Sequence, residues 1–151
     1  MTAPAIEPPP HRVAAVRRAT AEDAATITVL RGEALAELAP LRGGQLYEPA
    51  DLPAMDDVDR PVWAGIVADA VVGYLSGRVE GRLGKVDGIY VDPGCRAVGV
   101  GEAMMAEALD WFRERGCIGV DATALPGARA TKNFFEESGF TARLLVMHHS
   151  L

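Results

Sequence analysis

The sequence predicts a domain of mixed α and β structure, α+β in its first half and α/β in its second. A length of 151 residues is that of about one domain, since domains commonly run to roughly 100–200 residues. Hydrophobic residues make up 49% of the chain and charged residues 24%, which is the composition of a folded globular protein. Four prolines within residues 1–12 predict an extended lead-in, and residues 13–151 are predicted to form the single domain.

The first half begins with a predicted strand over Val13–Arg18 and a helix that follows it. Thr20 is a good N-cap, and the acidic residues Glu22 and Asp23 come in the first turn, where they favour the helix dipole. This helix is expected to run toward Leu38. Prolines and glycines then predict a loop to about residue 60.

The sequence predicts three antiparallel strands in the middle of the chain. Residues 62–67, 71–79 and 85–91 are rich in apolar residues and are separated by short polar or glycine turns. Gly88 lies inside the third of these strands, and a glycine there predicts a bulge or a close backbone approach.

Helix and strand alternate in the remainder. Met104, Met105, Ala108 and Phe112 recur at spacings of three and four, which predicts one buried helix face over residues 101–115. The patterns that follow predict a strand over 117–124, a helix over 128–137 and a final strand over 140–149.

Composition and charge exclude several classes of function. With 15 basic and 21 acidic residues the net charge is −6, so a nucleic acid is not expected as a partner. Neither a bilayer-spanning apolar stretch nor a secretory signal is apparent, which predicts a cytoplasmic protein without a membrane partner. The two cysteines, Cys95 and Cys117, form no CxxC motif, and we expect neither a zinc site nor a disulfide framework.

The segment with the clearest chemical meaning is Arg96–Gly101. Two glycines stand one residue apart at the start of a helix, where unpaired N–H groups and the helix dipole favour a phosphate. A dinucleotide-binding fingerprint would need a third glycine where Met104 stands, and no Gly-Lys-Ser/Thr is present for a Walker loop. A simple strand-to-helix turn stays open as the alternative.

The pattern Arg96-x-x-Gly99-x-Gly101, after a Val-Asp-Pro turn, resembles the acyl-CoA signature Q/R-x-x-G-x-G/A of the GNAT superfamily of N-acetyltransferases. The opening of the chain, Val16–Asp23, and the later run Phe134–Phe140 are also similar to segments of that family. The resemblance covers residues 13–151 in the family's order. It implies a central, mostly antiparallel sheet with splayed central strands flanked by helices.

The resemblance also implies acetyl-CoA as co-substrate, with no metal, held on a cradle of backbone amides. Its pantetheine arm would lie along one strand, and its thioester would lie where the strands 85–91 and 117–124 diverge. A backbone N–H of that first strand would then polarise the thioester carbonyl. The implied cofactor-binding residues are Ile89, Tyr90, Val91, Arg96, Ala97, Val98, Gly99, Val100 and Gly101.

An amine acceptor must lose a proton before it attacks a thioester. Asp87 stands where many members of the resembled family carry an acidic residue and is the first candidate base, with Glu80 second. In the resembled family a tyrosine usually protonates the leaving thiolate, and Phe135 stands at its position here. Tyr90, Ser138 or water would then be the acid. No neighbouring base is evident for Cys95, which is therefore not expected to act as a nucleophile.

The sequence therefore predicts transfer of an acetyl group from acetyl-CoA to a primary amine by direct attack in a ternary complex. The alternative is an acyl-CoA-binding module or sensor, favoured by Phe135 and by Ala128, where the family often has asparagine. An acidic loop, residues 48–59, could steer a cationic amine, and Tyr47, Trp63 and Tyr74 could line its pocket. Because resembled proteins are often dimers, a homodimer paired through the final strand is a further expectation.

Overall fold

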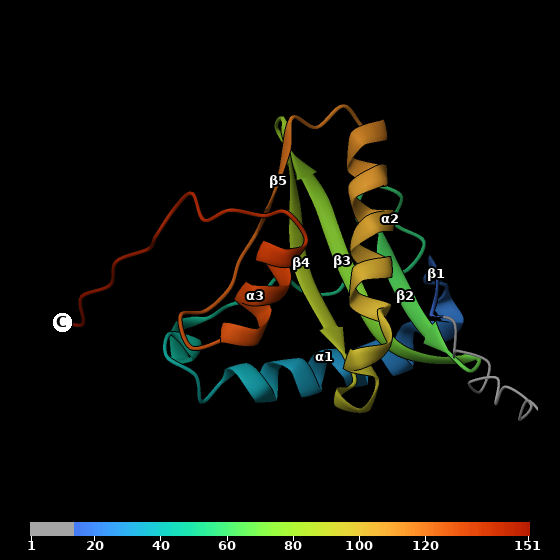
Figure 1. Cartoon of the computed structure of the whole chain (residues 1–151), viewed down its shortest axis with the longest axis horizontal. Coiled ribbons are helices and arrows are strands. Elements are labelled where there is room, and N and C mark those ends of the chain that lie inside the picture. Colours follow the sequence, from blue (N-terminus) through green and yellow to red (C-terminus); the bar gives the residue numbers. More distant parts are fainter. Residues whose placement is uncertain (1–13) are drawn as a thin grey trace, which may run out of the picture.

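The computed structural model describes residues 14–151, so the predicted lead-in lies outside the described residues. Within that range the chain forms a five-stranded sheet in the order β1-β2-β3-β4-β5 (Figure 1). The first four strands pair antiparallel, whereas β5 runs parallel to β4. The predicted class, a mostly antiparallel sheet with helices, is confirmed. The strands are β1 (Ala15–Arg18), β2 (Val62–Val67), β3 (Ala70–Glu80), β4 (Leu83–Val91) and β5 (Gly119–Ala122).

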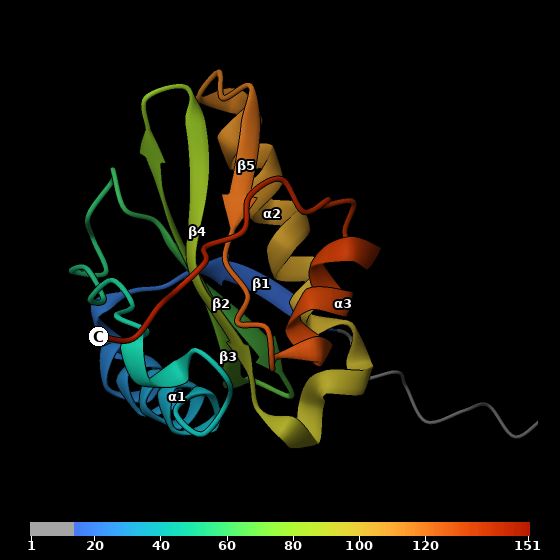
Figure 2. The same ribbon diagram turned by 90° about the vertical axis from the view of Figure 1, so that its left-hand side faces the viewer.

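Helices cover both faces of the sheet, with α1 on one side and α2 and α3 on the other (Figure 2). One core cluster joins α2 to the sheet through Leu75, Met104 and Phe112, and a second joins α1 through Ile27 and Tyr74. No helix among residues 14–151 is long and apolar enough to cross a membrane. The helices are α1 (Ala24–Leu38), α2 (Val100–Glu114) and α3 (Arg129–Glu137), with short 3-10 turns at Ala21–Asp23, Gly44–Leu46 and Pro93–Val98.

The start of the first helical segment is fixed by the predicted Thr20 and Asp23. The backbone N–H of Thr20 donates to the Asp23 carboxylate at 2.8 Å, and the Arg17 guanidinium donates to both carboxylate oxygens, at 2.6 and 2.9 Å. These contacts lower the pKa of Asp23 to about 2, the Arg17 hydrogen bond being the largest cause. The ion pair therefore ties β1 to the entrance of α1.

The strand β4 contains a bulge beside the predicted Gly88. Ser76 pairs with Gly88 while Gly77 pairs with Val86, which leaves Asp87 as the extra residue. Pairing between β4 and β5 ends at Val86 and Ala122, although β4 continues to Val91. The predicted divergence of these two strands is confirmed, and Asp87 lies at the point where they part.

The predicted final strand over residues 140–149 is wrong. Residues 140–151 have no regular secondary structure, and Figure 1 shows the chain after α3 leading away from the sheet. A β-strand is stable only when its backbone groups pair with a neighbouring strand. The apolar run Leu144–Met147 has the composition of a strand but no such neighbour within the described chain.

Candidate active site

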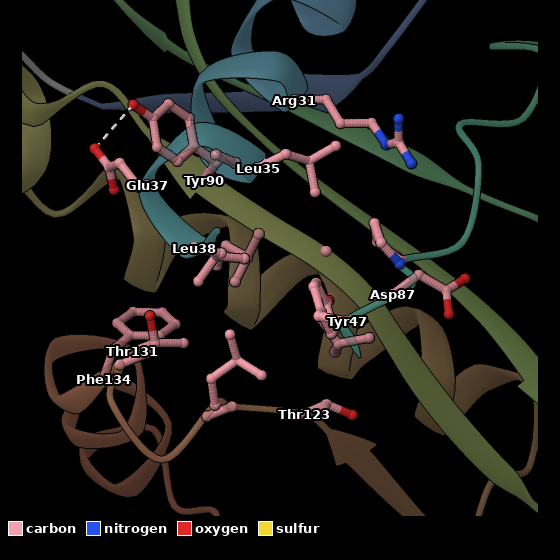
Figure 3. A pocket seen from close by; sticks show the side chains of 18 of the residues that line it. Arg31, Leu35, Glu37, Leu38, Tyr47, Asp87, Tyr90, Thr123, Thr131 and Phe134 are labelled. Atoms are coloured by element: carbon pink, nitrogen blue, oxygen red, sulfur yellow. Dashed lines mark hydrogen bonds between the residues drawn. The ribbon is translucent and has the colours of Figure 1, made fainter. Parts of the chain in front are cut away.

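A cavity of about 1030 Å³ opens where β4 and β5 part. Residues 86–91 of β4 form its floor, the second half of α1 and the following loop form one wall, and residues 123–135 form the other (Figure 3). Gly101 and Glu102 bring the first turn of α2 to the same cavity. The cavity therefore joins the predicted glycine segment to the predicted reaction site.

The glycine segment forms a compact turn before α2. Gly99 has a φ of +81°, a left-handed conformation that strains other residues, and α2 begins at Val100. A Cβ on Gly101 would lie 3.1 Å from the ring of Phe134. The glycines thus let the first turn of α2 approach the cavity, with N–H groups that lack acceptors within the helix.

The Arg96 side chain holds this turn to α1. Its Nη2 donates to both carboxylate oxygens of Glu37, at 2.9 and 3.0 Å, and its Nε donates to the carbonyl of Val91 at 2.9 Å. The guanidinium also lies over the ring of Tyr90, 5.3 Å from its centroid. Arg96 lines the cavity, and in this structure its charge is paired with Glu37.

Backbone hydrogen bonding shows which groups of β4 face the divergence. The N–H of Asp92 donates to Val72 in β3 at 2.7 Å. Since successive residues in a strand alternate in direction, Tyr90 also points its backbone groups toward β3. Ile89 and Val91 then direct their N–H groups to the opposite side, which β5 has left.

Asp87 is the acidic side chain set into the floor of the cavity. Its Oδ1 accepts from Arg78 Nε at 3.1 Å, while its Oδ2 is buried and has no hydrogen-bond partner within the described structure. An unpaired buried carboxylate oxygen is energetically costly, and a catalytic role is one of the reasons for which a protein retains such a group. Glu80, by contrast, does not line the cavity and forms an ion pair with Arg78 at the end of β3.

The three tyrosines of the cavity differ in their surroundings. The Tyr90 hydroxyl donates to Glu37 at 3.3 Å, and burial together with Glu37 raises the pKa of Tyr90. Burial raises the pKa of Tyr74 to about 12. Tyr47, from the 3-10 turn after α1, faces the centre of the cavity, and its pKa is raised by burial and then by the nearby charge of Asp87 (Figure 3).

The α3 wall contributes Phe134 and Phe135 to the cavity lining. Of these two, Phe135 is the residue expected to replace the family's usual tyrosine. Ala128, at the start of α3, also lines the cavity. Sequence reasoning missed the polar residues Arg129 and Thr131 on this wall. The closest sequence signal for these two residues is the helical pattern of residues 128–137, which does not show which face of the helix lines a cavity.

Other residues considered from the sequence lie elsewhere. Trp63 is buried in the core and packs edge-on against Trp111. Cys95 and Ser138 are absent from the cavity lining, and the Ser138 hydroxyl donates to the carbonyl of Phe134. Arg31 of α1, which the sequence did not single out, does line the cavity and donates to the carbonyl of Ala50 at 3.1 Å.

The sequence profile of the acetyltransferase (GNAT) family matches residues 33–140, well over half of the chain. The chain belongs to this family. It is accordingly an N-acetyltransferase of the GNAT type, and the resemblance indicated by the glycine signature is confirmed.

The individual relatives share little sequence identity with this chain. The chain is 28% identical to the glucosamine 6-phosphate N-acetyltransferase of Trypanosoma brucei brucei over 115 residues, which cover 72% of this chain and 76% of the relative. A tetramutant of the BH1408 protein from Bacillus halodurans matches with a TM-score of 0.79 and 14% identity, over 91% of this chain and 99% of the other. The aminoglycoside N-acetyltransferase AAC(6')-Iy, solved with CoA, gives a TM-score of 0.71 and 15% identity, covering 91% and 98%. At these identities the solved structures support the fold alone.

Proposed function

We propose that this protein transfers an acetyl group from acetyl-CoA to a primary amine by direct attack within a ternary complex. The observation that carries the proposal is the buried, unpaired Oδ2 of Asp87 at the place where β4 and β5 diverge. A base with a free lone pair is what an incoming ammonium group requires.

The residues of the cavity suit acetyl-CoA. The first turn of α2, with Gly99, Val100 and Gly101, offers backbone N–H groups to the pyrophosphate, and the adjoining 3-10 residues Arg96, Ala97 and Val98 complete the cradle. Arg129, across the cavity, adds a positive charge for a phosphate. The backbone groups of Ile89 and Val91 are available to the pantetheine arm on the side that lacks a β5 neighbour, whereas Tyr90 between them pairs with β3.

The proposed reaction proceeds without a covalent enzyme intermediate. The amine nitrogen forms a bond to the acetyl carbon, the carbon–sulfur bond breaks, and the sulfur leaves as the CoA thiolate. Asp87 accepts the proton that the ammonium group gives up before attack, and water takes the second proton that the nitrogen loses as the amide forms. The N–H of Ile89, directed into the divergence, donates to the carbonyl oxygen as negative charge develops on it.

Protonation of the leaving thiolate is assigned to water. Phe135 carries no hydroxyl, and the hydroxyl of Tyr90 is directed to Glu37 with its pKa raised, which makes it a weaker acid. A thiol has a reference pKa of about 8.5, so a thiolate can leave before it is protonated. If Tyr90 is nevertheless the acid, the Tyr90→Phe variant will lose most of its turnover with acetyl-CoA affinity retained.

For the acceptor we propose a small amine that also carries an anionic group. Arg31 lines the cavity near Tyr47 and Tyr74, and its ion pair with the exposed Asp51 is long, at 3.8 Å. Its charge is therefore available to a phosphate or carboxylate on the substrate. The relative named as a glucosamine 6-phosphate N-acetyltransferase suggests an amino sugar phosphate as the first compound to try.

A polycationic aminoglycoside is the competing acceptor. Glu48 lines the cavity, and the loop that follows carries four aspartates, so its charge favours a cation. The fold of AAC(6')-Iy makes an aminoglycoside the second compound to try.

A panel of amines scored by release of CoA thiol tests the function. We expect turnover of at least one amine bearing phosphate or carboxylate, and a raised KM for that amine in Arg31→Gln. The matched control is Arg115→Gln. Arg115 lies over the ring of Trp111, on the other face of the sheet. Saturable acetyl-CoA binding without turnover of any amine would instead support the binding-module alternative, for which Phe135 and Ala128 are the specific observations.

A further inference from the structure

Two hydroxyl side chains of β3 line the cavity and play no part in the proposed reaction. Tyr74 is 4% exposed and Ser76 is 7% exposed. The side-chain hydrogen bonds formed around them, from Arg78 to Asp87 and from Tyr90 to Glu37, involve neither hydroxyl. Within residues 14–151 both hydroxyls therefore lack a partner. Such nearly buried polar groups are normally satisfied by a ligand or by water.

Gly88 leaves an open space in front of these two hydroxyls. It pairs directly with Ser76 across the two strands, so the two residues face the same side of the sheet. A Cβ on Gly88 would lie 3.2 Å from the hydroxyl oxygen of Tyr74 and 3.6 Å from that of Ser76. Both oxygens therefore border the space that a side chain at this position would fill.

The space adjoins the carboxylate that is proposed as the base. Asp87, the extra residue of the bulge, directly precedes Gly88, and both line the cavity. Burial raises the pKa of Tyr74 to about 12, so its hydroxyl stays neutral. A neutral hydroxyl, like that of Ser76, can both donate and accept a hydrogen bond. The cavity floor thus offers a negative charge and, beside it, two neutral hydroxyls.

Arg31 completes this part of the cavity. Burial raises the pKa of both Tyr47 and Tyr74, and the nearby charge of Arg31 opposes the rise in each. Figure 3 shows Arg31, Tyr47 and Asp87 at one end of the cavity, with Phe134 of α3 at the other. A ligand at this end therefore meets a carboxylate, neutral hydroxyls and a guanidinium.

We propose that Ser76 and Tyr74 form a subsite for a hydroxyl group of the acceptor, which is therefore an amine with a hydroxyl on the neighbouring carbon. The inference rests on the proposed function, because the amine nitrogen must lie at Asp87 for that hydroxyl to reach Gly88. A ligand hydroxyl suits the subsite because it can accept one hydrogen bond and donate another. A charged group would be buried there among neutral partners.

Pairs of amines that differ only in this hydroxyl test the proposal. The pairs are ethanolamine with ethylamine, isoserine with β-alanine, and γ-amino-β-hydroxybutyrate with γ-aminobutyrate. The last two pairs carry the carboxylate proposed to meet Arg31, and the first does not. We expect wild type to favour the hydroxylated member by at least ~10-fold in kcat/KM, because the other member leaves the site's hydroxyls unpaired. Release of CoA thiol measures the rate.

Three variants should reduce this preference to less than ~3-fold, with little change for amines that lack the hydroxyl. Ser76→Ala and Tyr74→Phe each remove one hydroxyl, and Tyr74→Phe keeps the ring that packs in the core. Gly88→Ala places a methyl group in the space. The matched controls are Thr28→Val, which removes an exposed hydroxyl of α1, and Gly119→Ala in β5, since both residues lie outside the cavity lining. Both controls should keep the wild-type preference.

Calorimetric titration of the same pairs, with CoA present, separates the subsite from the reaction. If the hydroxylated members bind at least ~10-fold more tightly and no amine is acetylated, the subsite stands and the proposed transfer fails. Equal kcat/KM and equal affinity within every pair would mean that the hydroxyls hold only water, and would overturn the subsite while leaving the transfer in place. Absence of both binding and turnover for all pairs, or a preference that survives Ser76→Ala and Gly88→Ala, would also overturn it.

Discussion

In the proposed reaction, Asp87 acts through one atom, its buried Oδ2, which has no hydrogen-bond partner within the described residues. We expect Asp87→Asn to lower kcat/KM for the amine by ~10²- to 10⁴-fold, the usual contribution of a positioned general base. The amide keeps an acceptor for Arg78 Nε, so the fold and acetyl-CoA affinity should change little. Steady-state kinetics with both substrates and a binding titration provide the measurement. Glu80→Gln, which alters a carboxylate outside the cavity lining, is the control, and an Asp87→Asn variant as active as this control would refute the assignment.

Asp23 is a second carboxylate whose environment has a measurable consequence. The pKa of Asp23 in the folded protein, about 2, lies below the ordinary value of 3.8. The ionised carboxylate therefore stabilises the native state at pH values above 3.8. This stability is lost as pH falls from about 4 toward about 2. We expect Asp23→Asn to lower the free energy of unfolding at neutral pH by about 2 kcal/mol, and the difference from wild type to shrink across that range.

Urea unfolding at several pH values measures this difference. Asp56→Asn, in the exposed part of the loop before β2, should have almost no effect at any pH. A deficit in Asp23→Asn that stayed constant down to pH about 2 would mean that the charge of Asp23 does not provide the stability.

The turn that joins β4 to α2 depends on the backbone freedom of Gly99. Its φ of +81° lies in the left-handed region, where an L side chain costs roughly 1–2 kcal/mol. Gly99→Ala should therefore lower Tm by about 3–6 °C in a protein of this size. Gly32→Ala is the matched control, because Gly32 is an exposed residue inside α1 with open space around it, and there alanine should raise Tm slightly. Equal shifts for the two variants, measured by calorimetry, would contradict the strain argument.

The same turn is joined to α1 by Arg96. Arg96→Gln removes its charged hydrogen bonds to Glu37, and we expect the KM for acetyl-CoA to rise by roughly 3- to 10-fold with kcat nearly unchanged. The control is Arg113→Gln, which removes an exposed pair with Asp110 on the outer side of α2. A lower kcat with an unchanged KM would place Arg96 in the chemical step instead.

The elements that could be predicted from sequence are those fixed by neighbouring residues. The strand, turn and helix from β4 to α2 follow from a short apolar run, a proline and closely spaced glycines. Arg31, Arg129 and Thr131 could not be assigned, because their elements meet the cavity only through packing between distant segments. The strand expected at residues 140–149 failed for a related reason, since an apolar pattern shows the tendency to pair but not whether a partner strand is present.

At the scale of the whole molecule, the proposed function depends on the divergence of two parallel strands, β4 and β5. The core under β4 is close-packed, since a Cβ on Gly84 would lie 2.5 Å from the ring of Phe112. Pairing then stops at Val86 and Ala122, and the bulge sets Asp87 into the resulting cavity. The close-packed half of the sheet thus lies directly beside the open half, where acetyl-CoA and the amine are proposed to meet.

Calorimetric titration of the full chain with acetyl-CoA tests this account most directly, with desulfo-CoA and NAD titrated in parallel. The account predicts saturable binding of the two CoA compounds and none of NAD. It also predicts loss of binding in Gly101→Glu, whose side chain would enter the cradle against Phe134, and wild-type binding in the exposed control Gly32→Glu. Folded wild-type protein that binds neither CoA compound, or a Gly101→Glu variant that binds them as well as wild type, would contradict it.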